Sequence, residues 1–418
     1  MSAGMAITSS WISGTILVHS SASPLTILSP CSCSSSGPRV ICRSQVGPPT
    51  GLKLILHDAL DSSGFDTTHV RAAREGFCGQ IRDFSSIERE TSIVINRGVD
   101  LGKTALYIAA EDDSLISHSS VPLPVEAFID RLDDHSMQFC SHYSSNFRSS
   151  SPEEFFKYLE IYLYIDKGFR RSSSRNPLEQ RALYLPSVLT HRVGSSVMLS
   201  LVYSEILKTL RLWGMLTFDV EIFFPHDSQG LPKGYLKKKS LESHQPHILT
   251  SEALLIRTLR DLKNAFWPFQ FDSSNRSLFL RAADAADNSR EHEDSAFRLA
   301  SAKAAQHRLD RGVWTSVRLG DMKRALSACE HLILMNVDMK EIRDYGALLY
   351  HCGFYEESME YLKHYSNSKF VRSSDSISIE EDEAVEKLIA RLNLVAMEVG
   401  WTRSSSVKHF LTRNSEPW

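Results

Sequence analysis

The segment from Leu185 to Gly214, "LPSVLTHRVGSSVMLSLVYSEILKTLRLWG", has the pattern in this sequence that could best support covalent chemistry. A turn-like Arg-Val-Gly-Ser-Ser run precedes an apolar stretch whose periodicity predicts a helix over about 196–212. Several cysteine hydrolases and acyl transferases carry a nucleophile at such a helix start, where the helix dipole favours a thiolate. In this chain the two candidate positions, Ser195 and Ser196, hold serine.

A serine at this position has two interpretations. As a nucleophile it needs a well-placed base and an oxyanion hole, because a helix dipole alone cannot ionise a hydroxyl. As a structural residue it caps the helix, which stabilises a helix by about 1 kcal/mol. The sequence favours the capping interpretation and leaves the catalytic one open.

Helices are expected before this segment, and a strand after it. Apolar residues recur at helical spacing over 101–111 and in "PVEAFIDRLDDHSMQFCSHY", and Ser151 before Pro152 is typical of a helix N-cap. "TFDVEIFFP" alternates in hydrophobicity, which predicts a strand, and a polar, solvated loop that contains "KGYLKKK" is expected next. Trp267 and Phe269 in "AFWPFQ" are expected to pack the sheet against the elements that follow.

The last third of the chain is repetitive. "RLGDMKRALSACEHLIL" and "YHCGFYEESMEYLKHY" share one frame, in which Gly320 matches Gly353 after 33 residues, and this period is typical of tetratricopeptide repeats. Helical hairpins are predicted from 300–318 with 322–335 and from 341–351 with 355–365, and a helix over about 383–399 is expected to cap them. Two units are too few to bury a free-standing solenoid, so they should pack against the preceding part of the chain.

Composition excludes several classes of function. The formal net charge is −3 and no basic run dominates, which argues against nucleic-acid binding by bulk electrostatics. No run of about 18 apolar residues predicts a membrane-spanning helix. The seven cysteines form no CxxC pair, "GVDLGKT" lacks the full spacing of a phosphate loop, and His244 and His247 are interpreted as loop residues. No metal and no cofactor are therefore expected.

The first fifty residues differ from the rest. They contain no acidic residue and are rich in serine, which is typical of an organelle transit peptide. No arginine precedes Arg39, and Pro24 and Pro30 interrupt any amphipathic helix, so plastid import is favoured over mitochondrial import. We expect a chloroplast protein, most simply in the stroma, with the mitochondrion as the alternative; a disordered tail is the simplest other interpretation.

The order of these parts resembles the SirB-type transglutaminase-like family with C-terminal tetratricopeptide-like repeats, in its plastid-targeted plant form. The resemblance extends over about 100–366 and is most specific in Leu185–Leu210. It implies an α+β, predominantly helical fold, with a papain-like or transglutaminase-like core followed by a short repeat array. The expected divisions are a transit peptide at 1–50, a helical segment at 51–175, the core at 176–283, repeats at 296–366, and an acidic linker with a final helix at 367–418.

The resemblance also implies where a catalytic site would lie. Such a site would consist of a thiolate at the helix start, a histidine on a following strand and an Asp or Asn that orients the histidine. These roles fall on Ser196, on His226 just after "EIFFP", and on Asn264, with Asp261 and Asp272 as other orienting candidates.

We therefore predict a non-catalytic plastid factor that binds another protein through its repeats, in an interaction, assembly or regulatory role. The candidate contact residues are Arg318, Lys323, Glu330 and Tyr350. The alternative is a hydrolase or acyl transferase that uses Ser196 and His226. Neither a nucleic acid nor an integral membrane span is expected.

Overall fold

The computed structural model describes eleven segments of the chain: residues 51–86, 100–117, 121–147, 151–172, 177–218, 220–224, 230–236, 251–269, 276–286, 321–371 and 379–401. All described residues belong to one unit, which lies within Ser44–Trp418. The predicted transit peptide therefore lies outside the described residues.

The described chain begins with three helices. α1 spans Leu56–Ser62, α2 spans Thr68–Ser86 and α3 spans Leu101–Ser117, and α2 packs along α3. The helix predicted at 101–111 is confirmed and continues to Ser117. The buried face of α3 includes small and apolar side chains, Ala105, Leu106 and Ala109, which allow close packing.

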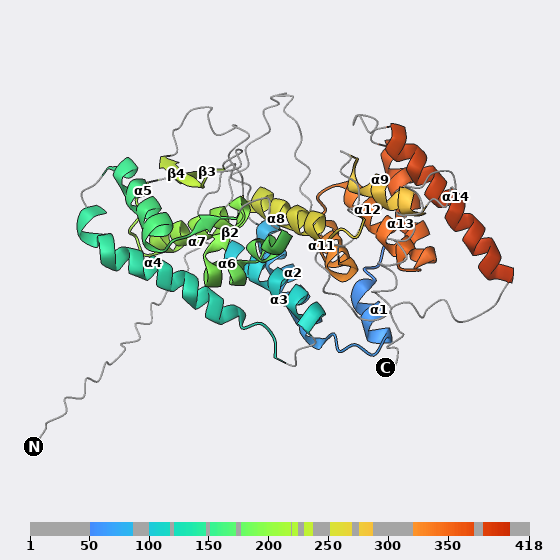
Figure 1. The fold of residues 1–418 in the computed structure, drawn as a ribbon, viewed down its shortest axis with the longest axis horizontal. Coiled ribbons are helices and arrows are strands. Elements are labelled where there is room, and N and C mark those ends of the chain that lie inside the picture. The colour runs from blue at the N-terminus through green and yellow to red at the C-terminus, as the bar shows by residue number, and fades with distance from the viewer. Residues whose placement is uncertain are drawn as a thin grey trace, which may run out of the picture. The chain divides into compact units, whose positions relative to one another are not determined.

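The next elements surround the serine pair. They are α4 (Val125–Phe147), α5 (Pro152–Glu160), a π-helix η1 (Ile161–Asp166), a 3₁₀-helix η2 (Pro177–Leu183), α6 (Leu185–His191) and α7 (Ser196–Leu212). The predicted cap at Ser151 is confirmed, because its side chain and that of Glu154 form a reciprocal capping box. α4 packs against α7, and Figure 1 shows these helices grouped with α5.

Strands contribute little to the described structure. β1 (Arg170–Arg171) pairs in parallel with β2 (Val193–Gly194), and β3 (Val220–Phe223) pairs antiparallel with β4 (Lys233–Leu236). β3 confirms the predicted strand. β4 corrects part of the loop prediction. The first four residues of "KGYLKKK" form this strand and pair with β3, and the three lysines that follow lie outside the described residues.

The C-terminal elements are all helical. α8 (Ser251–Phe266) and α9 (Leu278–Ala286) precede α11 (Met322–Leu334), α12 (Met339–His351), α13 (Tyr355–Val371) and α14 (Ile379–Trp401). The last four agree closely with the predicted helices at 322–335, 341–351, 355–365 and 383–399. The helix predicted at 300–318 lies outside the described residues.

The C-terminal helices pack as a layer that is joined to the rest of the unit. α11 packs on α12, α12 on α13 and α13 on α14, and α11 also packs on α8, α3 and α1 (Figure 1). Gly346 and Ser358 allow α12 and α13 to approach closely: a Cβ on Gly346 would lie 3.1 Å from the Leu362 side chain, and Ser358 donates to the Gly346 carbonyl at 2.7 Å. The C-terminal helices therefore pack against the preceding part of the chain, as expected.

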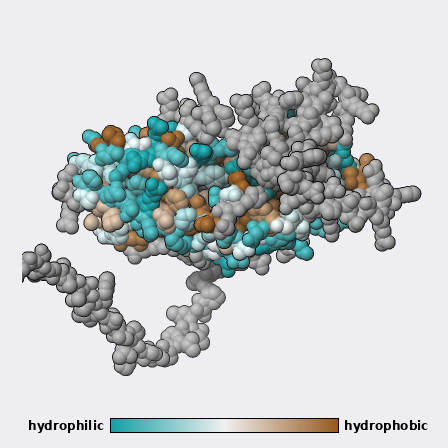
Figure 2. All heavy atoms as spheres, turned by 60° about the horizontal axis from the view of Figure 1, so that its bottom comes forward, coloured by the Kyte–Doolittle hydropathy of each residue, from teal (hydrophilic) through white to brown (hydrophobic). Residues whose placement is uncertain are grey.

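Buried apolar residues from Leu52 to Leu392 form one continuous cluster. Trp267 and Phe269 belong to it, and the Phe269 ring lies 4.4 Å from the His351 ring of α12, so this aromatic run does contact the C-terminal helices. In the view of Figure 2, hydrophilic residues cover much of the described surface and hydrophobic ones form small separate patches. Among the described helices, none combines the length and the hydropathy needed to cross a bilayer. The fold confirms the predicted helix-rich class.

Candidate functional site

The α7 N-terminus is set by a short, constrained connection. α6 ends at Arg192, which adopts a left-handed conformation with φ 60°, and β2 follows immediately. The Arg192 guanidinium donates to the Lys167 carbonyl at 2.8 Å, and the Ser195 amide donates to the Ala182 carbonyl at 2.9 Å. A non-glycine residue in this conformation needs support from its surroundings, and these hydrogen bonds supply it.

The two serines have different environments. Ser195 is the N-cap: its Oγ accepts a hydrogen bond from the Met198 amide at 3.2 Å. Ser196 lies in the first turn with 6% of its surface exposed, and its Oγ has no hydrogen-bond partner among the described residues. The serine pair thus contains one satisfied cap and one buried hydroxyl at the positive end of a long helix.

The strand pair after α7 touches the same helix farther along. The Gly234 amide of β4 donates to the Tyr203 hydroxyl of α7 at 3.1 Å. A Cβ on Gly234 would lie 2.6 Å from the Phe156 ring and 2.7 Å from the Tyr203 oxygen, so only glycine fits at this contact. Neither β3 ("VEIF") nor β4 ("KGYL") contains a histidine, so these two described strands offer no imidazole base.

The structure describes two of the other predicted catalytic residues, Asn264 and Asp261. His226 and Asp272 lie outside the described residues. Asn264 lies exposed on α8, and Asp261, on the same helix, forms an ion pair with Arg257 at 3.3 Å. The orienting role of these α8 residues stays a prediction.

The predicted contact residues need a correction. Lys323 and Glu330 are 2% and 1% exposed, so they cannot form part of an accessible surface in this conformation. Tyr350 is half-buried, with its ring beside those of His351 and Tyr355. Arg318 lies outside the described residues. The sequence predicts Lys323 and Glu330 as contacts on a concave repeat surface, but in the fold α11 is covered by other helices.

A buried ionic cluster explains why Glu330 lies inside. Arg74 of α2 donates to Glu111 of α3 at 2.7 Å and to Glu330 of α11 at 2.8 Å. His57 Nε2 and His331 Nε2 lie 3.2 and 3.3 Å from the Glu111 carboxylate. Burial opposes the ionisation of Glu111, but Arg74 outweighs it and holds the pKa of this carboxyl well below its ordinary value.

This cluster could not be found by short-range sequence signals. The two carboxylates belong to helices α3 and α11, and each is paired with an arginine from a third helix. Breaking a buried pair of this kind is costly because one charge is left uncompensated in the interior. The arrangement therefore joins the N-terminal helices to α11 and has a structural rather than a catalytic character.

A second buried carboxyl lies next to this cluster. Asp112 of α3 accepts a hydrogen bond from the Tyr184 hydroxyl at 2.7 Å through one oxygen, while its other oxygen is buried and has no hydrogen-bond partner among the described residues. Burial raises the pKa of Asp112 to about 7, against the opposing effect of the Tyr184 hydrogen bond. Arg324 lies near this pair, with its guanidinium 3.8 Å from the centre of the Phe266 ring.

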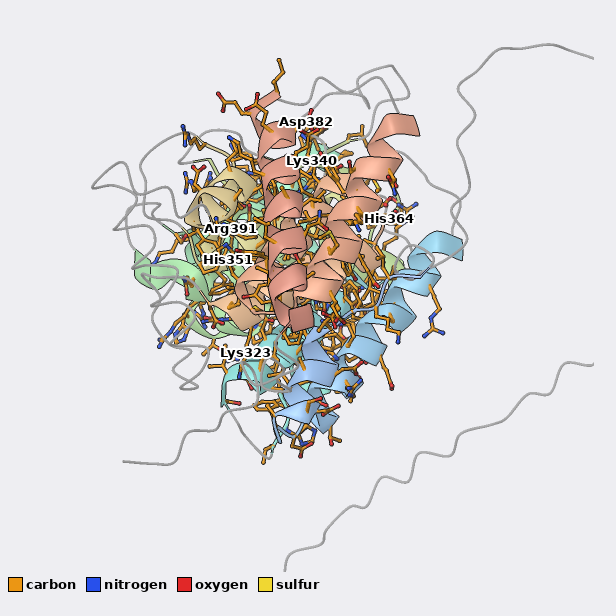
Figure 3. All side chains as sticks on the ribbon, turned by 90° about the vertical axis from the view of Figure 1, so that its right-hand side faces the viewer. Lys323, Lys340, His351, His364, Asp382 and Arg391 are labelled. Carbon is orange, nitrogen blue, oxygen red and sulfur yellow. The ribbon has the colours of Figure 1, made fainter. Side chains whose placement is uncertain are left out.

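α9 is held at its middle and at its last residue by two side chains of the C-terminal layer. His351 of α12 donates to the Ala282 carbonyl at 2.8 Å, and Arg391 of α14 donates to the Ala286 carbonyl; Figure 3 shows His351 and Arg391 near one another in view. Burial lowers the pKa of His351 to about 4, so this imidazole is neutral at physiological pH. Cations and donors at a helix C-terminus satisfy its last carbonyls, which is a stabilising role.

No group of three or more His, Cys, Asp or Glu side chains in the described segments is arranged to hold a metal ion. The described cysteines Cys78, Cys140, Cys329 and Cys352 are free thiols. Burial raises the pKa of each of them, which suits packing rather than nucleophilic chemistry.

Comparison with known proteins gives one match. The family profile described as the transglutaminase-like superfamily matches residues 126–214, which extend from α4 through the whole of α7. No curated protein and no solved structure matches the chain. The match begins before the predicted core boundary at 176 and ends before β3. The chain therefore contains a transglutaminase-like superfamily domain, and the α7 N-terminus with its two serines belongs to it.

Proposed function

We propose that this protein is a non-catalytic interaction, assembly or regulatory factor of the plastid, of the SirB type, in which a transglutaminase-like domain has lost its nucleophile and is joined to tetratricopeptide-like repeats. The observation that carries the proposal is the state of the α7 N-terminus. Ser195 uses its side chain as a cap, and Ser196 is buried and in contact with no base among the described residues. A hydroxyl without a base is a poor nucleophile.

The strand pair supports the same proposal. The base of a transglutaminase-like site is expected on a strand after the nucleophile helix, yet β3 and β4 contain no histidine. On β4, Gly234 contacts Tyr203 of α7, and close packing excludes a side chain at this position. The interior of this contact is thus filled by Tyr203 and Phe156 rather than by an ionisable pair.

One specific observation favours the alternative, a serine hydrolase or acyl transferase that uses Ser196. A buried hydroxyl without a hydrogen-bond partner at a helix N-terminus is the kind of unsatisfied group that active sites retain. In this alternative His226 would supply the base.

A fluorophosphonate probe distinguishes the two. The full chain, its Ser196→Ala variant and its Ser195→Ala variant are incubated with the probe, and covalent labelling is measured by mass spectrometry. The proposal predicts that none of the three is labelled. Labelling of the wild type and of Ser195→Ala, but not of Ser196→Ala, would establish the alternative.

The cellular part of the proposal needs a separate test. Proximity labelling with the tagged full chain in plant cells should return a reproducible set of plastid proteins. The set should be the same for Ser196→Ala, because the proposed role does not use this hydroxyl. A mitochondrial set would instead support the other compartment that the first fifty residues allow.

A further inference from the structure

The segment before α1 contacts the C-terminal helices through its main chain. The Ile55 and Leu56 amides donate to Glu330 Oε1 at 3.1 and 3.0 Å, and the Ile55 amide also donates to the Tyr345 hydroxyl at 3.0 Å. The Tyr361 hydroxyl donates to the Lys53 carbonyl at 2.8 Å. Glu330, Tyr345 and Tyr361, which we call the docking face, come from three successive helices, α11, α12 and α13.

The docking face is rigidly prepared for these contacts. Tyr345 donates to Glu330 Oε1 at 2.5 Å, and Glu330 Oε2 accepts from Arg74 at 2.8 Å, so the carboxylate is held from two sides. The Tyr345 and Tyr361 rings lie 4.9 Å apart at 66°, an edge-to-face contact. Side chains fixed in this way bind a partner without a large loss of their own conformational freedom.

The bound segment depends on this face for its own structure. α1 has only seven residues and its N-cap, Ile55, provides no side-chain cap. The Glu330 carboxylate replaces that cap, because it accepts from the first amides and places a negative charge at the positive end of the helix. A helix this short is not stable by itself, so its formation is coupled to docking.

The side chains of the segment show which peptide the face accepts. Leu52 and Leu56, four residues apart, are buried, whereas Lys53 between them is exposed. The hydrogen bonds recognise main-chain atoms only, which any sequence could supply. A peptide with two apolar anchors four residues apart is therefore the chemical class of ligand.

We infer that the docking face is a peptide-binding site, and that residues 52–56 of the same chain are the peptide that occupies it. The contact joins residues that are 275 positions apart between Ile55 and Glu330. It goes beyond the proposed function, because it concerns binding within the chain and does not depend on the chemistry at Ser196. A partner that presents a similar segment would have to displace residues 52–56.

The test uses the full chain with Leu52→Asp and Leu56→Asp, which removes the anchors of the internal peptide and leaves the docking face intact. The probe is a fluorescein-labelled peptide of residues 51–66, "GLKLILHDALDSSGFD", measured by fluorescence anisotropy. The control peptide carries the same two aspartates. A tethered segment competes at a millimolar effective concentration, so the wild-type chain should bind the probe at least about tenfold more weakly than the variant.

The inference predicts binding to the variant, loss of binding with the control peptide, and weaker binding when Tyr361→Phe is added. Absence of binding to a variant that remains folded by circular dichroism, or equal binding to variant and wild type, would overturn it. Either result leaves the fluorophosphonate and proximity-labelling experiments unaffected, so the two proposals fail separately.

Hydrogen exchange of the unaltered chain decides the question if the variant does not fold. If residues 52–56 are a bound peptide, they should detach while the helices of the docking face stay folded. The amides of Ile55 and Leu56 should then exchange at least about tenfold faster than those in the middle of α11 and α12. Exchange of both sets at one rate, through one cooperative opening, would show that residues 52–56 are an inseparable part of the core and would refute the inference.

Discussion

The matched substitutions Ser195→Ala and Ser196→Ala should change stability in opposite directions. Ser195 Oγ accepts the Met198 amide at 3.2 Å, so its removal leaves a helix amide unsatisfied and should lower the free energy of unfolding by about 1 kcal/mol. Ser196 Oγ is buried without a hydrogen-bond partner in the described structure. An unbonded buried hydroxyl costs about 1–3 kcal/mol, so alanine should raise the free energy of unfolding, by about 1 kcal/mol after the small loss of packing.

The assay is urea unfolding followed by circular dichroism, with the midpoints compared at equal m-values. Ser200→Ala is the control on the same helix, because the Ser200 hydroxyl is buried and satisfied by the Ser196 carbonyl at 2.8 Å. It should lower stability by about 1 kcal/mol or less. If Ser196→Ala lowers stability as much as Ser195→Ala does, the Ser196 hydroxyl has a partner and the reasoning is refuted.

A gain in stability for Ser196→Ala would fit both functional proposals, since catalytic groups are also often held unsatisfied at the expense of stability. The fluorophosphonate experiment separates them. Together, a stabilised alanine variant and an unlabelled wild type would identify the hydroxyl as a remnant without a catalytic role.

Three further outcomes are expected. Arg74→Met should lower the free energy of unfolding by about 3–5 kcal/mol in urea unfolding, because it leaves two buried carboxylates without their arginine partner. Arg71→Met on the same helix removes exposed ion pairs with Asp58 and Asp61 and should lower it by no more than about 1 kcal/mol. The pKa of Asp112 is raised from an ordinary 3.8 to about 7, so the folded chain keeps a proton that the unfolded chain has lost, and the free energy of unfolding falls as pH rises from about 4 to 7. Asp112→Asn should remove up to about 4 kcal/mol of this loss, so its stability advantage over the wild type should grow from about pH 4 to pH 7; an advantage that does not change with pH would contradict this. Gly234→Ala should lower the free energy of unfolding by about 1–3 kcal/mol and therefore lower the thermal midpoint. The control is Gly79→Ala in α2, where no atom lies within 4 Å of the new Cβ, and it should raise the midpoint slightly. Equal effects of the two substitutions would refute the close-packing argument.

The local signals of the sequence were sufficient for most helices. The structure agrees with the predicted N-cap at Ser151, the α7 start at residue 196 and the helices near 322–335 and 341–351. A cap is decided by residues three or four positions apart, and an amphipathic helix by a period that a single window contains. These features do not depend on the rest of the chain.

Burial of charge could not be predicted in the same way. Glu330 and Lys323 have residue types that are usually solvated, yet both lie inside. Glu330 is buried because Arg74 and the amides of residues 55 and 56 reach it, and these partners lie about 250 positions or more away. The hydrophobic periodicity of a segment does not indicate which distant helix will supply a compensating charge.

β4 and the two serines show the same difference between what local sequence predicts and what tertiary contacts decide. "KGYL" has the composition of a polar loop and becomes a strand only because β3 and Tyr203 are there to pair with it. Residue types alone identified two serines at a helix start. Only the tertiary structure assigned the cap to Ser195 and left the Ser196 hydroxyl buried and unpaired within the described residues, because hydrogen bonding and solvent exclusion depend on the atoms that surround each oxygen.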